Sequence, residues 1–224
     1  MGPADMSSPA GQLLSIASGA LLLTAVLVVW RRDLPVILRV LALQGVALAA
    51  MVGVLAWAEH SVELGLVATG LLLLRGGLVP WLVRRALAGA GPMQRETRPV
   101  INIAASLLAA AVLTLLALAV SVPIVDLAPS AATRAVPVAI AVVLIGLLVL
   151  VTRRHAVSQL VGFLLMDNGI TAAGFLTTAG IGLVVEVGVA LDVLLVVLVL
   201  QLLTGRIHET FGDIDISGLQ ELHD

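Results

Sequence analysis

Long stretches of apolar residues divide this sequence, and they constrain its fold more than any other feature. A helix needs about 20 apolar residues to cross a hydrocarbon layer roughly 30 Å thick. Seven stretches come close to that length, with charged or polar residues between them, and the third is interrupted by Arg75-Gly76-Gly77 and Pro80. The sequence therefore predicts an all-α, polytopic membrane protein with about seven transmembrane helices. The predicted spans are 11–30, 35–58, 62–83, 100–122, 135–151, 156–178 and 181–203.

Composition excludes several kinds of site. Only 12% of the residues are charged, whereas a typical soluble domain has about a quarter. The net charge of −2 and the absence of a basic run argue against nucleic-acid binding. The chain has no Cys, and its four His residues are scattered over three different segments, so we expect neither a metal site nor a bound cofactor.

The placement of Arg predicts how the helices are oriented. The connections after the first, third, fifth and seventh spans hold nine of the 12 basic residues, whereas the opposite side holds only Arg134. Because cytoplasmic loops are enriched in Lys and Arg, we expect the N-terminus outside and the C-terminus in the cytoplasm. Trp30, Trp57 and Trp81 lie at predicted helix ends, where indole rings rest among lipid headgroups. The expected location is the cell inner (plasma) membrane, in contact with the lipid bilayer.

The chain also resembles itself. A shift of 122 residues aligns Arg31 and Arg32 with Arg153 and Arg154. This similarity predicts two parallel three-helix units joined by a connector helix, although apolar helices also resemble one another by chance. The predicted division is a single transmembrane domain (1–203) with units 11–83 and 135–203 and connector 100–122, followed by a polar cytoplasmic tail at 204–224.

Three carboxylates lie inside the last two predicted spans. Asp167 is about 18 Å from the cytoplasmic end of its span, and Asp192 is about 18 Å from the outer end of the next one. Glu186 lies two turns further out than Asp192. An ionisable group at the centre of a membrane helix costs on the order of 2.5–3.5 kcal/mol and is a functional candidate. Burial favours the neutral acid, so we predict that the three residues carry protons, the alternative being structural hydrogen bonds between helices.

Other polar residues within the spans are candidate tuning or partner groups. Arg75 cannot lose its charge in practice. It therefore either snorkels toward the cytoplasmic face or pairs with a carboxylate from a neighbouring helix or subunit. Arg39 is expected to snorkel as an anchor, and Asn168 lies beside Asp167. Gln44 is a further polar residue, in the second span.

Two segments resemble a known family. They read RRHAVSQLVGFLLMDNG at 153–169 and VEVGVALDVL at 185–194. Together they are similar to the hydrogenase-4 component E family of membrane subunits, and the resemblance extends over essentially the whole chain. The last three helices are also similar to subunit K of respiratory complex I and to its counterpart in the multisubunit sodium/proton antiporters.

The resemblance implies a small subunit in the ion-translocating membrane arm of a group 4 nickel-iron hydrogenase or formate hydrogenlyase-type complex. The redox metals of such complexes belong to other subunits. The subunit K family has two buried Glu residues, of which the first corresponds by position to Leu164 and the second falls at or beside Asp192. Asp167 follows Leu164 by one turn on the same face, and the component E pattern usually has Glu there, so the reach of the proton path is in question.

The sequence thus favours a subunit that is not catalytic alone, contributes buried carboxylates to a proton pathway and scaffolds its neighbours. The expected partners are other membrane subunits of a hydrogenase or complex I-like assembly. One alternative is a subunit of a multisubunit cation/proton antiporter, and another is a self-sufficient small-solute carrier. Few polar residues are available to line a carrier's substrate site at the midplane. A purely structural membrane protein is the fourth interpretation.

Overall fold

The computed structural model describes residues 8–88, 102–153 and 156–178. This part of the chain is all-helical, which confirms the predicted fold class, and six of its helices are long and apolar enough to span a membrane. The predicted span 181–203, with Glu186 and Asp192, lies outside the described residues.

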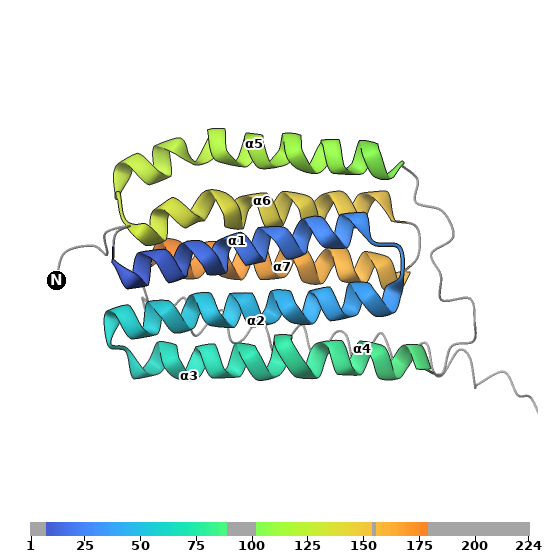
Figure 1. The fold of residues 1–224 in the computed structure, drawn as a ribbon, viewed down its shortest axis with the longest axis horizontal. Helices are drawn as coiled ribbons and strands as arrows, with labels where there is room; N and C mark the ends of the chain where they lie inside the picture. The colour runs from blue at the N-terminus through green and yellow to red at the C-terminus, as the bar shows by residue number, and fades with distance from the viewer. Residues whose placement is uncertain (1–7, 89–101, 154–155, 179–224) are drawn as a thin grey trace, which may run out of the picture.

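Short connections join the helices of residues 9–88, and a short connection also joins the two helices of residues 103–152 (Figure 1). The third span is a continuous helical rod made of α3, η1 and α4, in which the Arg75-Gly76-Gly77 segment is a π-helix and not a chain break. The elements are α1 (Pro9–Trp30), α2 (Leu34–Glu59), α3 (Val62–Leu71), η1 (Leu72–Leu78), α4 (Val79–Ala88), α5 (Ile103–Leu127), α6 (Ala131–Thr152) and α7 (Ala156–Thr178).

Among the helix boundaries that differ from the prediction, two lie near a proline inside a helix. The span expected to end at 122 continues through Pro123 to Leu127 as α5. Proline removes one backbone hydrogen bond without necessarily ending a membrane helix. The next span begins at Ala131 instead of 135, because Ser130 and Thr133 form a capping box that satisfies backbone groups in the first turn.

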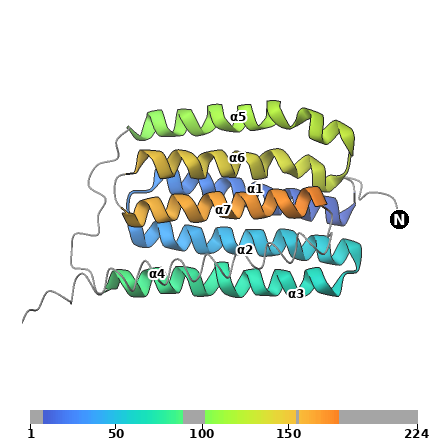
Figure 2. The same cartoon turned by 180° about the vertical axis from the view of Figure 1, so that it is seen from behind.

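The bundle has a central group of four helices and two flanks. Helices α1, α2, α6 and α7 pack together in the centre, α5 packs mainly on α6, and the α3, η1 and α4 rod packs on α2 at the opposite edge (Figures 1 and 2). The most apolar stretch of α2 is 61% buried, and that of α5 only 11%. Any polar group on the inner face of α2 is therefore enclosed by protein.

Helix directions agree with the predicted sidedness. Figure 1 shows α1 running parallel to α6, and α2 parallel to α7. The α1–α2 and α6–α7 connections and the end of α4 lie at one end of the bundle, whereas Arg134 lies near the other end. The division into two three-helix units stays a prediction, since the last helix of the second unit is outside the described residues.

Candidate functional site

Arg75 emerges from the π-helical segment η1. The backbone N–H of Val79 donates to the carbonyl of Leu74, five residues back, which is the bonding pattern of a π-helix. Gly76 and Gly77 follow Arg75 directly, and glycine weakens a regular α-helix. Short π segments occur often at functional sites, and this one directs a charged side chain into the bundle.

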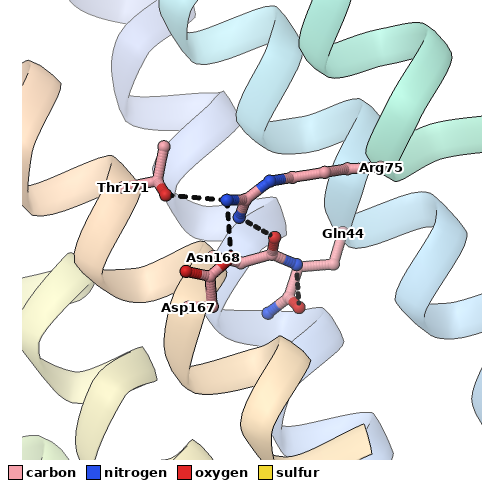
Figure 3. Close-up of polar contacts among 5 residues, drawn as sticks. All are labelled: Gln44, Arg75, Asp167, Asn168 and Thr171. Carbon is pink, nitrogen blue, oxygen red and sulfur yellow. Dashed lines mark hydrogen bonds and ion pairs between the residues drawn. The ribbon is translucent and has the colours of Figure 1, made fainter. Parts of the chain in front are cut away.

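Arg75 forms an ion pair with Asp167 of α7. Its Nη2 atom lies 2.5 Å from Oδ2 of Asp167 (Figure 3). The Arg75 side chain is 6% exposed and that of Asp167 is 17% exposed, so both charged groups are largely enclosed by the protein. Both residues lie near the middle of their spans, Val62–Arg85 and Ser158–Thr177. The pair therefore sits deep in the apolar layer.

The sequence left two alternatives for the Arg75 side chain, snorkelling to the cytoplasmic face or pairing with a carboxylate, and this contact decides between them. The side chain pairs with a carboxylate of a neighbouring helix in the same chain, and it does not snorkel to the surface. The contact also changes what is expected of Asp167. A carboxyl expected to lie among apolar side chains instead lies against a guanidinium.

Two more side chains of α7 hold the same guanidinium. Nη1 of Arg75 donates to Oδ1 of Asn168, and Nη2 donates to Oγ1 of Thr171 at 3.0 Å. Thr171 lies four residues after Asp167, so the two share one face of α7. Asn168, expected as a partner group, is thus in contact with Arg75, and Thr171 is a partner that the sequence interpretation missed.

A third element, α2, contributes through Gln44. Its side chain is fully buried, and its Oε1 accepts a hydrogen bond of 2.9 Å from Nδ2 of Asn168. Its own Nε2 donates to the backbone carbonyl of Leu21 in α1, at 3.5 Å. Sequence interpretation identified Gln44 as a polar residue in a span but gave it no role. Figure 3 shows the side chains that α2, η1 and α7 contribute, and the contact with Leu21 adds α1 to the site.

A small cavity lies beside the ion pair. Its volume is about 10 Å³, which is room for about one water molecule. Leu164 and Asp167 both line it, which confirms that they share a face of α7. The lining residues are Leu41, Arg75, Val79, Leu164, Asp167 and Asn168.

Arg39, the other predicted site residue that the structure describes, is not part of this cluster. Arg39 is exposed on the outer face of α2, and its role as an anchor stays a prediction. Asp192 and Glu186 lie outside the described residues, so their position relative to Asp167 stays a prediction.

A second buried guanidinium lies near the Arg-rich end of the bundle. Nη2 of Arg153 donates to the carbonyls of Val29, at 3.4 Å, and Arg31, at 3.2 Å. These carbonyls lie at the C-terminal end of α1, where the helix dipole favours a cation. Arg153, one of the arginines on the predicted cytoplasmic side, therefore also caps α1.

Comparison with known proteins gives one long and one partial similarity. The chain is 50% identical over 212 residues to "Uncharacterized protein Rv0085" of Mycobacterium tuberculosis H37Rv, covering 95% of this chain and 96% of that protein. It is 35% identical over 88 residues to hydrogenase-4 component E of Escherichia coli K12, covering 39% of this chain and 41% of that protein. The same extent of similarity is found with hydrogenase-4 component E of Shigella flexneri.

The partial similarity supports the predicted relationship to component E over a shorter stretch than the whole chain. No family model matches the chain. No solved structure matches it either.

Proposed function

The chain belongs to the same family as Rv0085 of Mycobacterium tuberculosis, and from this starting point we propose that it is a membrane subunit of a redox-driven, proton-translocating complex of the hydrogenase-4 or formate hydrogenlyase type. The similarity to hydrogenase-4 component E supports the kind of complex. In this proposal the chain is not catalytic alone. It lies in the cell inner membrane, scaffolds neighbouring subunits and contributes carboxylates to a proton path.

The observation that carries the proton role is the buried ion pair of Arg75 and Asp167. A charge in the middle of a membrane helix is costly, and a buried pair is often no more stable than well-packed apolar residues. Apolar side chains such as Leu41 and Leu164 already surround the pair. Packing alone therefore gives no reason for the pair, whereas proton transfer requires a group that can change its charge in this layer.

The geometry supports Asp167 as the group that takes the proton. Its side chain is the more exposed of the two, and it lines a cavity with room for about one water molecule. Arg75 stays charged at any physiological pH. A proton on Asp167 leaves that cation without its counter-charge, so the guanidinium favours the proton's release. Asp167 then acts as a transient carrier, with Asp192 and Glu186 as the further carriers of the proposed path.

Co-purification tests the kind of complex. The tagged chain is extracted from its native membrane in a mild detergent, and the proteins that remain bound are identified by mass spectrometry. We expect a hydrogenase-like large subunit among them. Recovery of antiporter subunits alone would instead favour the cation/proton antiporter, and a stable solitary protein would contradict both functions.

Proton uptake into inverted membrane vesicles tests the role of Asp167. Asp167→Asn is expected to lower uptake driven by the redox reaction at least tenfold, while the complex still assembles. Glu63→Gln is the matched control, since Glu63 is an exposed carboxylate in the first turn of α3. Normal uptake with Asp167→Asn would refute the proton role.

A further inference from the structure

We propose that a one-way chain of hydrogen bonds through Asn168 and Gln44 holds Arg75 in place, so that Asp167 is the only member of the ion pair that changes state. The statement about Asp167 rests on the proposed function. The statement about Arg75 rests on the contacts alone. In this proposal Gln44 is a positioning residue, because it acts on the ion pair through Asn168.

The direction of the chain follows from its first member. A guanidinium has five N–H donors and no acceptor. Asn168 must therefore turn its oxygen toward Arg75, which leaves its Nδ2 to donate to Oε1 of Gln44, at 2.9 Å. With its oxygen occupied in this way, Gln44 has only Nε2 for the next contact, the carbonyl of Leu21 at 3.5 Å.

The last member imposes the same direction. The Leu21 carbonyl belongs to the backbone of α1 and can only accept. Gln44 must therefore present its nitrogen to α1, and Asn168 in turn must present its nitrogen to Gln44. Both ends of the chain require the same orientation of both amides, so neither amide can flip without the loss of a buried hydrogen bond.

This arrangement stabilises the charge of Arg75 without Asp167. Both amide dipoles point their oxygen ends toward the guanidinium, and hydrogen bonds in a chain polarise one another. The Thr171 hydroxyl is a further acceptor for Nη2. When Asp167 becomes neutral, Arg75 still has acceptors on α7 that are anchored to α2 and α1. Gln44 and Asn168 are both at least 96% buried, so water competes little for these contacts.

The described groups in contact with Arg75 leave one candidate for titration. Asn168 and Thr171 do not titrate, Gln44 behind them does not either, and Arg75 itself stays charged. Helix α6, which packs along α7, contributes no charged residue to the cavity beside Asp167. Within the part of the chain that the structure describes, a proton that enters this site can therefore change only Asp167.

Solid-state NMR of the ¹⁵N-arginine-labelled protein in lipid bilayers tests the inference. The two Nη atoms of a held guanidinium give separate signals, and rotation about the Nε–Cζ bond, which exchanges their positions, merges them. The Arg75 signals are assigned by their loss in Arg75→Gln. In Asp167→Asn, which mimics a neutral carboxyl, we expect them to stay separate. In the double variant Asp167→Asn, Gln44→Met we expect the separation to be lost.

The control is Asp167→Asn with Leu48→Met, because Leu48 lies one turn after Gln44, is equally buried and is apolar. This variant should keep separate signals. Merged signals in Asp167→Asn alone would overturn the inference, as would separate signals in the double variant with Gln44→Met.

A measurement on the unaltered protein avoids any dependence on how the variants fold. The ¹³C shift of the Asp167 carboxyl is followed against pH, and the Arg75 Nη signals should stay separate when that carboxyl is protonated. Their merging would overturn the inference. This result is distinct from the vesicle assay: normal proton uptake in Asp167→Asn would refute the proposed function and leave the hold on Arg75 intact.

Discussion

Gly45 of α2 lies directly against the backbone of Arg75. A Cβ atom on Gly45 would stand 2.5 Å from the carbonyl carbon of Arg75 and 2.8 Å from the nitrogen of Gly76. The two backbones are therefore in contact where the π-helix begins to direct Arg75 inward. Gln44 is the adjacent residue on α2, so this approach sets the distance between Arg75 and the amide chain that holds it.

Gly45→Ala should destabilise the bundle and displace Arg75, because neither backbone can give way as a flexible side chain does. Forcing one extra carbon into a packed site costs about 1–3 kcal/mol, and more where backbone must move. Gly53→Ala on the same helix is the control, because its Cβ would lie 3.9 Å from Cβ of Ala68 and alanine favours a helix. Denaturation in mixed micelles measures both, and equal stability of the two variants would contradict the prediction.

Removing one member of the ion pair should cost more than removing both. Asp167→Leu leaves a buried guanidinium without its counter-charge, and breaking such a pair costs about 3–5 kcal/mol. Arg75→Met with Asp167→Leu replaces both groups by apolar side chains in an apolar setting, so the double variant should be more stable than Asp167→Leu alone. Unfolding in mixed micelles gives the free energies of unfolding of the unaltered protein, of Asp167→Leu and of the double variant. A double variant no more stable than Asp167→Leu would count against the prediction.

Arg153→Gln should destabilise α1 from its C-terminal end. The change removes a cation and its two contacts with the carbonyls of Val29 and Arg31, a loss of about 1–2 kcal/mol. Arg32→Gln removes an equal charge from an exposed position at the same end of the bundle and should change stability by less than about 0.5 kcal/mol. Amide hydrogen exchange in the last turn of α1 distinguishes the two variants. Equal protection of these amides in both variants would contradict the prediction.

Gly162→Ala should weaken the packing of α6 on α7. Its Cβ would meet the backbone nitrogen of Leu150 at 2.6 Å, so the two helices would have to separate. The control is Gly19→Ala, at a position with no heavy atom within 4 Å. We expect a loss of about 1–3 kcal/mol for the first variant and none for the second. An unchanged unfolding midpoint in Gly162→Ala would contradict the prediction, since it would show that α6 and α7 adjust to the extra carbon.

Single cysteines test the predicted sidedness, since the chain has no Cys of its own. A cysteine at Ser61, in the α2–α3 connection, should react with a membrane-impermeant maleimide added to intact cells. One at Arg32, in the α1–α2 connection, should react only after the membrane is opened. The reverse pattern would contradict the positive-inside assignment.

Much of the fold could be predicted from the sequence because its signal is local. A span of apolar residues must be helical in lipid, where every backbone group needs an internal partner. Two of the boundary errors lie close to Pro123 and Pro137, which are both inside helices. In α5 the helix continues past Pro123, and in α6 the Ser130 cap starts the helix six residues before Pro137.

The site was only partly predictable because its contacts are not local. The free-energy cost of a charged group inside a membrane identified Asp167 and Arg75 as separate candidates. Their ion pair, however, joins residues 92 positions apart on two helices. Gln44 contacts Asn168 across a sequence separation of 124 residues. Asn168 and Thr171 carried local signals, as the neighbour of Asp167 and by a four-residue spacing from it, and only the second of these was overlooked.

The cavity beside Asp167 has a kinetic consequence. Room for about one water molecule allows a single hop between that water and the carboxyl, whereas a relay across roughly 30 Å of hydrocarbon needs many successive hops. Within the described residues this site therefore has the dimensions of a stopping place for a proton. Its throughput would be governed by the residence time on Asp167 and by how often a donor or acceptor from elsewhere reaches that one water.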